Sequence, residues 1–514
     1  MADMLDKIKD LIVRKDSCVF FAVFLFFLLL NLWGGCARLP VPTRSPHIGE
    51  SGPLGQCADF FASLDKQIAK ADVIDPGAFR VKNYPYLRVD RFLASFSEEV
   101  NDSAAFAVWV DRMQALDRDA RKYEIANLPI STTAALDPAN DKAGLYNKVV
   151  DCGDMLKAAD FQNSKLQEEL RKKVTAPDEY ILLRRVLGIY PFTSMFIYRG
   201  VTIWHTEARN SYSPEPPVNW QSTRYRPTPK IDIASARHTI EPTKRDALGI
   251  PVYTSEARKA LFQLHAPLWQ IQFESDDDRI GSPLWTPRGD LDVDTKQSLT
   301  YTLLSFTRFG KEILTQLNYI IWFPARPKEG SFDIYGGFLD GVNYRVTLDS
   351  NHQPLLYETV HNCGCYYKAY PTKRLQVRTK IDYAEPPLIL EAPDLEPSKD
   401  FMTVAMESRT HYVQHLYPSP RQLPAGTTAY SLVEYGQLLS LPFSTDDRKS
   451  MFSQNSIAPG SERLERYILW PTGVLSPGAM RQWGRHAVAF LGKRHFDDPF
   501  SMNRMFEPRG VKQN

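Results

Sequence analysis

The densest group of chemically reactive side chains is the sequence HNCGC at residues 361–365, which directly follows a β-type run ending at Val360. If the strand continues, His361, Cys363 and Cys365 project from one face, because extended side chains alternate with a period of two. One imidazole and two thiolates can share a soft metal such as zinc or copper(I). A fourth ligand has to come from elsewhere in the chain, and the candidates are His352, His411, His415, His486 and His495.

The same residues have two other interpretations. Cys363 and Cys365 could form a redox disulfide, in which Gly364 permits the tight backbone and His361 stabilises a thiolate. Alternatively, the two cysteines only fix a loop and His361 is an ordinary buried residue. We favour this structural interpretation, because the sequence shows no second half for a metal or redox site.

A second candidate group lies near the C-terminal end, where arginines and histidines alternate with tryptophans. Clustered guanidinium and imidazole groups beside aromatic rings can bind phosphate or carboxylate groups of envelope glycans or lipids. Packing of the arginines on aromatic faces and pairing with nearby acids is the simpler interpretation. The anion-pocket candidates are Arg481, Arg485, His486, Arg494 and His495.

Two weaker patterns imitate known metal sites. His411 and His415 have the spacing of a metalloprotease helix, but the glutamate that should follow the first histidine is missing. Residues 290–294 resemble the start of a calcium loop, but Thr295 stands where that loop needs glycine. We therefore interpret both segments as strand or loop.

Common catalytic signatures are missing from the sequence. It contains no glycine-rich phosphate loop, no GxSxG motif and no dinucleotide fingerprint. A hydrolase would need an unrecognised set such as Asp340, Glu358 and His361. The sequence therefore leaves open whether the chain is an enzyme.

The N-terminal region contains a long apolar run. From Cys18 to Leu30 no residue is charged, and Arg14 and Lys15 precede the run. A basic flank is expected to stay in the cytoplasm, which orients the rest of the chain outward. Extended to Gly35, the run has about 18 residues, close to the ~20 that span a bilayer as a helix. We expect residues 1–36 to be a signal peptide or a membrane anchor.

The end of this run resembles the lipobox of bacterial lipoproteins, in which a signal peptidase cuts before a lipid-modified cysteine. Gly34, Gly35 and Cys36 carry the resemblance, while Trp33 occupies the position of the usual aliphatic residue. The resemblance implies lipidation at Cys36, and Ala37 implies sorting to the outer membrane. The alternative is an uncleaved signal anchor. In both cases the bulk of the chain is expected on the periplasmic or extracellular side.

Charge and composition exclude one class of partner. The chain has 62 basic and 60 acidic residues among 514, with 43% hydrophobic content. A field this weak does not attract nucleic acid. At ~150 residues per domain, a globular chain of this length has room for two or three domains.

Cysteine usage is consistent with export. Four of the six cysteines lie beyond the apolar run, and thiols in an oxidising compartment are expected to pair. Three connectivities are possible. Locality favours Cys57 with Cys152 and Cys363 with Cys365.

The first half of the exported part has a helical pattern. A proline-rich tether at 37–56 is followed by a helical domain at 57–210, in which Phe61, Leu64 and Ile68 illustrate the spacing of three and four. We interpret the apolar stretch 180–204 as a buried helix followed by a strand or a second helix. A proline-rich joint at 211–251 ends this half.

The second half, residues 252–514, is predicted to be an α+β domain. Its β-type runs pair as antiparallel hairpins across turn-forming residues. Short helices are expected at 255–265 and 429–440, and a longer one at 476–491, with Ser476 as N-cap and Pro477 in the first position. The runs lie at residues 267–273, 299–306, 313–323, 342–348 and 354–360.

The fold class expected for the whole chain is α+β, with an N-terminal membrane segment, a helical domain and a mixed domain rich in antiparallel hairpins. The expected function is that of a membrane-tethered, exported bacterial envelope protein that binds or scaffolds. The alternative is a metal or thiol-redox protein centred on residues 361–365. We favour the absence of a cofactor, with zinc or copper at this motif as the alternative.

Overall fold

The computed structural model describes residues 45–136, 141–162, 164–229, 239–240, 244–422 and 426–510. The apolar run from Cys18 to Leu30 and the lipidation candidate Cys36 lie outside the described residues. Within the described part of the chain, no helix is both long enough and apolar enough to cross a bilayer.

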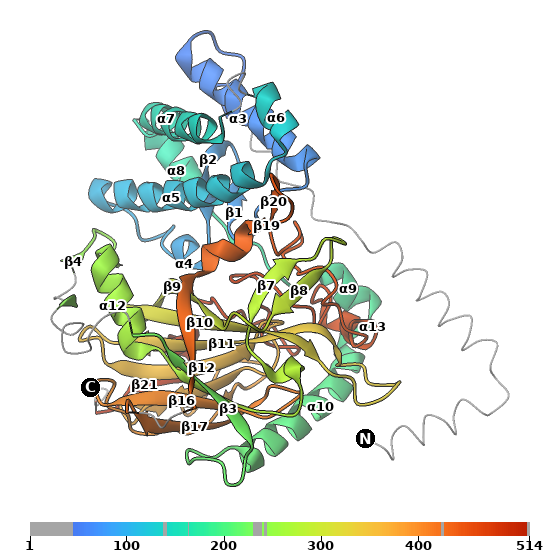
Figure 1. Ribbon diagram of the computed structural model, residues 1–514. Coiled ribbons are helices and arrows are strands. Elements are labelled where there is room, and N and C mark those ends of the chain that lie inside the picture. Colours follow the sequence, from blue (N-terminus) through green and yellow to red (C-terminus); the bar gives the residue numbers. More distant parts are fainter. Residues whose placement is uncertain are drawn as a thin grey trace. The chain divides into compact units, whose positions relative to one another are not determined.

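The N-terminal region is helical, as the periodicity predicts, and its helices pack around a short hairpin (Figure 1). Asp102 and Asp141 cap two of the helices by accepting hydrogen bonds from backbone N–H groups of the first turn. The elements are α3 (Pro53–Lys70), β1 (Phe79–Val81), β2 (Tyr84–Val89), α4 (Arg91–Ala94), α5 (Ser103–Asn127), α6 (Ile130–Leu136), α7 (Lys142–Asp160) and α8 (Ser164–Lys173).

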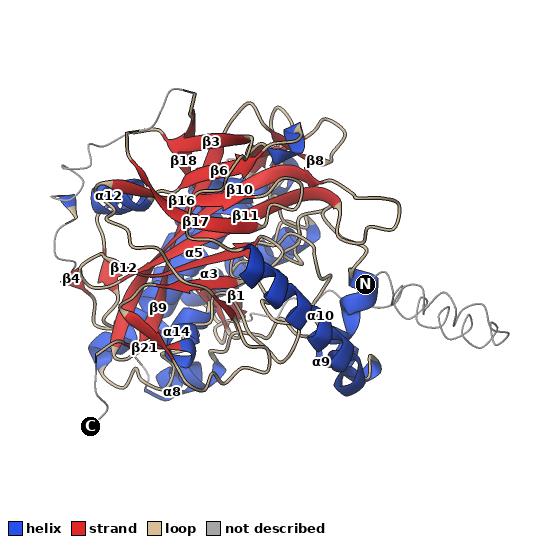
Figure 2. Cartoon of the chain, turned by 90° about the horizontal axis from the view of Figure 1, so that it is seen from below, coloured by secondary structure: helices blue, strands red, loops and turns tan. Residues whose placement is uncertain are grey.

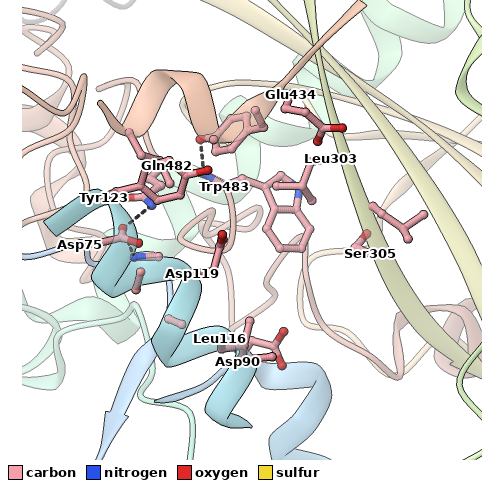
Figure 3. Close-up of a pocket in the computed structure, with 18 of the residues that line it drawn as sticks. Asp75, Asp90, Leu116, Asp119, Tyr123, Leu303, Ser305, Glu434, Gln482 and Trp483 are labelled. Carbon is pink, nitrogen blue, oxygen red and sulfur yellow. Dashed lines mark hydrogen bonds between the residues drawn. The ribbon is translucent and has the colours of Figure 1, made fainter. Parts of the chain in front are cut away.

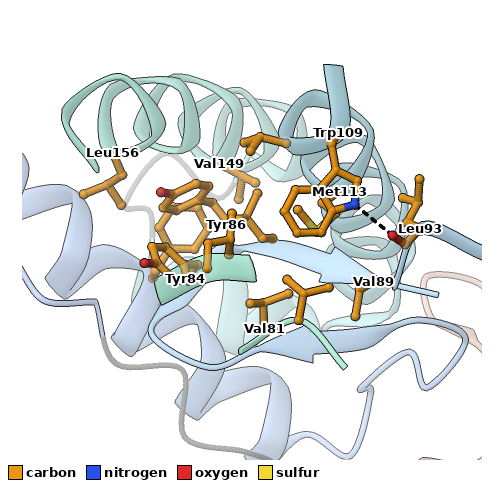
Figure 4. Packing of buried hydrophobic residues seen from close by; sticks show 14 of the residues in the cluster. Val81, Tyr84, Tyr86, Val89, Leu93, Trp109, Met113, Val149 and Leu156 are labelled. Atoms are coloured by element: carbon orange, nitrogen blue, oxygen red, sulfur yellow. Dashed lines mark hydrogen bonds between the residues drawn. The ribbon is translucent and has the colours of Figure 1, made fainter. Parts of the chain in front are cut away.

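The core of this region forms where α5 and α7 meet the hairpin (Figure 4). Trp109 and Met113 of α5 are completely buried there, and the Trp109 indole N–H donates a 2.8 Å hydrogen bond to the carbonyl oxygen of Leu93. A disulfide between Cys57 and Cys152 joins α3 to α7. This is the pairing that locality favours.

Two further helices follow, α9 (Leu182–Leu187) and α10 (Tyr190–Ser211). The expectation of a second helix in the stretch 180–204 is confirmed, but the expectation of burial is wrong. No residue of α9 is buried, and Ala208 is the one buried residue of α10. Both helices expose their apolar side chains.

A mixed sheet of eleven strands follows the helical region, so the α+β class is confirmed. Its order is β15-β13-β12-β11-β10-β9-β18-β3-β6-β16-β17, and the strands curve into a half-barrel (Figure 2). Its strands are β3 (Ser222–Pro227), β6 (Leu268–Gln272), β9 (Leu299–Phe309), β10 (Glu312–Arg326), β11 (Gly337–Leu348), β12 (Pro354–His361), β13 (Lys368–Pro371), β15 (Leu388–Ile389), β16 (Asp400–Met406), β17 (Val413–Pro420) and β18 (Thr428–Glu434).

The predicted hairpins form the long side of this sheet. Strands β9 to β13 pair antiparallel in sequence order. Parallel pairs occur where β18 meets β9 and β3, where β16 meets β6, and where β15 meets β13. The sheet is mixed because most of these parallel neighbours come from distant parts of the chain.

Smaller elements connect and flank the sheet. The helix expected at 255–265 is present as α12. The elements are β4 (Lys244–Arg245), β5 (Pro251–Val252), α12 (Ser255–His265), η1 (Asp276–Asp278), β7 (Ser282–Trp285), β8 (Leu291–Asp294), β14 (Leu375–Val377), η2 (Tyr435–Leu439), β19 (Leu441–Pro442), β20 (Arg448–Lys449), α13 (Arg466–Leu469), η3 (Trp470–Thr472), α14 (Ser501–Met505) and β21 (Phe506–Pro508).

Two helix predictions are wrong. Residues 429–440 form strand β18 and the short η2 instead of one helix. Residues 476–491 form no helix, because their backbone bonds to neighbouring segments. The N–H of Arg481 donates to the Asn362 carbonyl oxygen at 2.8 Å, and Gly478 and Gly484 have the left-handed φ angles 81° and 86°.

The sequence-predicted helical and mixed domains belong to one compact unit, Thr43–Asn514. Arg308 of β9 illustrates the junction between them. Its guanidinium pairs with Glu99 at 2.8 Å and donates to the Ser95 hydroxyl at 2.9 Å. The joint expected at 211–251 lies within this unit.

Candidate functional site

A cleft of about 930 Å³ lies between helix α5 and strand β9 (Figure 3). Leu116, Asp119 and Tyr123 line it from α5, at helical spacings of three and four, and the alternation of β9 presents Leu303 and Ser305. The volume falls in the ~300–1,000 Å³ range typical of small-molecule sites.

Two of the carboxyl groups that line the cleft also accept hydrogen bonds from nearby backbone N–H groups. Asp75 accepts hydrogen bonds from the Gly77 N–H at 3.0 Å and from the Gln482 side chain at 2.6 Å. Asp90 caps α4 by accepting the Leu93 N–H at 2.7 Å. Burial raises the pKa of both groups, that of Asp90 to about 6.

Asp119 differs from these two carboxyl groups. It is exposed to the cleft, and among the described residues its side chain has no hydrogen-bond or ion-pair partner. The surrounding protein and the charge of Asp75 raise its pKa, although Lys122 and Arg258 act in the opposite direction. Asp119 is therefore a charge that the fold does not neutralise.

Aromatic side chains line the same cleft, and hydrogen bonds hold two of them, Trp483 and Tyr435, in place. The backbone N–H of Trp483 donates to the Tyr435 hydroxyl at 2.8 Å (Figure 3), and its indole N–H donates to Asn318 at 3.2 Å. Tyr123 lines the α5 side. The cleft thus combines fixed aromatic faces with an unpaired carboxylate.

The HNCGC motif does not continue strand β12, so the predicted alternation of its side chains is wrong. The strand ends at His361, whose carbonyl oxygen accepts the Gly364 N–H at 2.7 Å and whose N–H donates to the Cys365 carbonyl oxygen at 3.0 Å. Gly364 has a φ of 90°, and a Cβ there would lie 2.5 Å from the Ala487 oxygen. Glycine is required at this tight turn.

Cys363 and Cys365 are free thiols rather than the disulfide that locality suggests. The contact with Cys363 and burial hold the pKa of the Cys365 thiol well above its usual value, which disfavours a reactive thiolate. Within the described chain, no group of three or more His, Cys, Asp or Glu residues has a metal-binding arrangement.

His361 instead joins a buried chain of acids and histidines. Its Nδ1 lies 3.4 Å from one oxygen of Asp340, and the other oxygen of Asp340 lies 2.8 Å from Nδ1 of His411. Nε2 of His411 is 3.5 Å from Asp278. Asp340 thus bridges the two imidazole rings.

The charges alternate along this buried network of side chains from Asp278 through His411 to Asp340. Burial acts to raise the pKa of Asp340, but the two histidines hold it well below its usual value. Burial acts to lower the pKa of His411, but its contacts with Asp278 and Asp340 outweigh burial and raise it. For His361 burial prevails and lowers the pKa. Burial thus favours the neutral form of His361, and its Nε2 has no partner among the described residues.

Backbone strain is concentrated around this network. The non-glycine residues Leu339, Tyr366, Arg409 and His411 have φ angles between 54° and 64°. Each such residue costs about 1–3 kcal/mol, and strain of this kind clusters at functional sites. The ring centroids of Tyr366 and Tyr412, two partly buried residues, lie 5.0 and 5.6 Å from that of His361.

Other residues proposed from the sequence lie elsewhere. Glu358 is not part of a hydrolase set with Asp340 and His361, because both of its oxygens pair with Arg345 at 2.7 Å. His415 lies on β17, with its ring nitrogen 2.9 Å from the carbonyl oxygen of Glu215. Residues 290–294 form a hairpin strand and its turn.

The anion-pocket candidates serve as structural donors in this fold. Arg481 donates to the backbone oxygens of Cys363 and Ser476, and Arg494 donates to those of Glu385 and Val488. Arg485, His486 and His495 contact groups that are close in space but distant in sequence. Their nearest partners are Pro76 and Glu179 for Arg485, Asn362 for His486, and Asp178 for His495.

The cleft and the pairing of Asp340 with His411 were not found from the sequence. The contributing residues are scattered, and no spacing rule links positions 75, 119, 305 and 483. Comparison with family models finds no match, and neither curated proteins nor solved structures provide one. Function must therefore be inferred from the geometry of this chain.

The network predicts a pH-dependent contribution of His411 to stability. Because the pKa of His411 is higher in the folded chain than the ~6.5 of an unfolded histidine, the contribution is complete below pH 6.5 and declines as pH rises through the folded pKa. His411→Gln should lower the free energy of unfolding by about 3–5 kcal/mol at pH 6, and by less at pH 9.

Urea denaturation between pH 6 and 9 measures this difference. His415→Gln is the control, because its ring is only partly buried, and it should change stability by no more than about 0.5 kcal/mol. A His411→Gln effect that stays constant across this range would contradict the assigned charges.

Proposed function

We propose that this chain is an exported, membrane-tethered envelope protein that binds a small organic cation in the cleft between α5 and β9. The observation that carries the proposal is Asp119, a carboxyl group with a raised pKa and no partner among the described residues, which faces an aromatic cleft. The membrane anchor is the apolar N-terminal run of the sequence, which the proline-rich stretch 37–56 connects to the rest of the chain.

Export is supported by the disulfide between Cys57 and Cys152, which joins two helices 95 residues apart in sequence. Such bonds persist in oxidising compartments and are rare in the cytosol. The basic flank and uncharged run at residues 14–30 favour the same orientation.

A cationic ligand is supported by electrostatics. The pKa of Asp119 is raised because neighbouring cations do not compensate for burial and for the charge of Asp75. A bound ammonium group would supply the missing charge, and the faces of Trp483 and Tyr123 attract cations through their ring quadrupoles. An anionic ligand would face added repulsion.

Export predicts the redox state of the cysteines in cells. With thiols alkylated at lysis, peptides with Cys57 and Cys152 should react only after reduction, whereas Cys363 and Cys365 should react once the chain is unfolded. Protease added to intact spheroplasts should digest the chain beyond residue 45. Reduced Cys57 and Cys152 in a protease-protected chain would overturn export.

Cation binding predicts that Asp119 controls affinity. Titration calorimetry with choline, spermidine and arginine amide should detect binding of at least one, and Asp119→Asn should weaken it at least tenfold, because a hydrogen bond to a charged group contributes about 1.5–3 kcal/mol. Affinity should fall as pH drops through the raised pKa of Asp119. The control is Asp151→Asn, an exposed aspartate of α7. Binding of none of the three, or equal binding by Asp119→Asn, contradicts the proposal.

A second candidate function is general base catalysis by His361. A neutral imidazole oriented by a carboxylate, with its other nitrogen unoccupied, is the arrangement that deprotonates a nucleophile in many hydrolases. The unpartnered Nε2 of His361 and the strained backbone around it favour this candidate.

This candidate predicts hydrolysis of p-nitrophenyl acetate or bis-p-nitrophenyl phosphate that depends on His361. His361→Gln should lower the rate by about 10²–10⁴-fold, the usual contribution of a positioned base. His265→Gln replaces another buried histidine, at the end of α12, and should leave the rate unchanged. Hydrolysis of neither substrate, or equal rates in wild type and His361→Gln, would exclude catalysis of these two ester classes by His361.

A further inference from the structure

Helices α9 and α10 present a continuous apolar surface to solvent. Ten exposed large hydrophobic side chains of the described chain lie between Leu182 and Ile203, and Phe192, Met195 and Phe196 expose 68–77% of their surface. Exposed Leu464, Tyr467 and Ile468 lie at the neighbouring α13. We call the exposed residues of 182–203 and 464–468 the apolar face. A soluble monomer rarely exposes so large a cluster, so the face indicates a binding surface.

The apolar face is held rigidly. Arg185 of α9 donates to the carbonyl oxygens of Thr472 and Gly492 at 2.7 and 2.6 Å. Its guanidinium also lies over the rings of Tyr180 and Tyr190, at 4.6 and 4.5 Å. These contacts fix α9 and the start of α10 against residues 472–492. The apolar side chains of the two helices are therefore exposed in the folded chain itself.

The charge of this segment has one sign. Between Ile181 and Thr206 the sequence contains no aspartate or glutamate, whereas Arg184, Arg185 and Arg199 are basic. Arg199 is exposed on α10. Arg184 and Arg185 donate to backbone oxygens of residues 472–492, so Arg199 is the arginine that this segment presents to anionic lipid headgroups.

The helices fit the membrane interface better than the membrane interior. Within the described chain, α10 included, no helix qualifies as a bilayer span. Tyr198 and Tyr467 are half exposed, and tyrosine favours the headgroup level of a bilayer. The face therefore has the composition of helices that lie in the plane of the interface.

The proposed tether brings a bilayer within reach. Eight residues lie between Cys36, at the end of the apolar run, and Ser45, the first described residue, and the nine residue steps of a fully extended chain span about 30 Å. A unit anchored by the apolar run would thus stay near lipid, which favours a bilayer over a second copy as the partner of the apolar face.

We propose that the apolar face docks on the surface of a lipid bilayer containing anionic headgroups, with α9 and α10 in the plane of the interface. The inference rests on the proposed membrane tether, which it extends with a second contact. Docking would fix the orientation of the unit relative to the membrane.

Photolabelling of the full-length chain tests this proposal. The chain is reconstituted in phosphatidylethanolamine–phosphatidylglycerol vesicles that carry a diazirine-labelled acyl chain, and labelled peptides are identified by mass spectrometry. Labelling is expected in both the N-terminal run 18–35 and peptide 186–199. The double variant Phe192→Glu/Phe196→Glu should lower labelling of peptide 186–199 at least tenfold and leave that of the N-terminal run unchanged.

Val252→Glu is the matched control. Val252 is half exposed and pairs with Lys244 of β4. Strand β4 lies away from α9 and α10 in both views of the fold (Figures 1 and 2). This variant should label like the wild type.

The outcomes separate the inference from the proposed function. Labelling confined to the N-terminal run would overturn docking and leave the tether standing. Labelling confined to peptide 186–199 would support docking and contradict the tether, and labelling of neither would contradict both. Crosslinks between two copies through peptide 186–199, without lipid label there, would identify the face as a dimer interface and overturn docking.

Discussion

Strand β18 joins the two halves of the sheet, and the positions of both candidate sites depend on it. Residues 428–430 pair in parallel with β3, and residues 431–434 pair in parallel with β9. Without β18, backbone groups on two central strands would lose their partners, which costs free energy wherever they are buried. The same strand leads into η2, whose Tyr435 holds Trp483 at the cleft.

The buried acid–histidine network makes a second connection between these halves. Asp340 and His361 belong to the antiparallel half, on β11 and β12, whereas His411 precedes β17 in the other half. A charged network in such a position requires each member, because removing one leaves its partner buried and unpaired. Stability and acid–base chemistry can therefore share these residues.

The cleft, the network and the apolar face differ in what they expose. In the part of the chain that the structure describes, Asp119 offers a charge without a partner, His361 a ring nitrogen without a partner, and α10 apolar surface without a cover. Each is unfavourable in isolation, and each would gain from a different species: a cation, a proton donor or a lipid. The proposed functions follow from these three imbalances.

The sequence determined the features that depend on local order. Alternating residues and turns gave the hairpins from β9 to β12, and proximity along the chain gave the pairing of Cys57 with Cys152. Local pattern failed at 429–440 and 476–491, where backbone groups bond to distant segments, and at α10, where periodicity shows a stripe but not what covers it.

The candidate sites were decided by tertiary structure. The sequence offers Asp340 and His361 only as members of one hypothetical catalytic set, and no motif includes Asp119. Contacts between residues far apart in the chain produce no recognisable sequence motif. The pairing of β11 with β12 places Asp340 near His361, and the packing of separate elements brings His411 to Asp340 and Asp119 to the cleft. These contacts belong to the assembled fold rather than to any single segment.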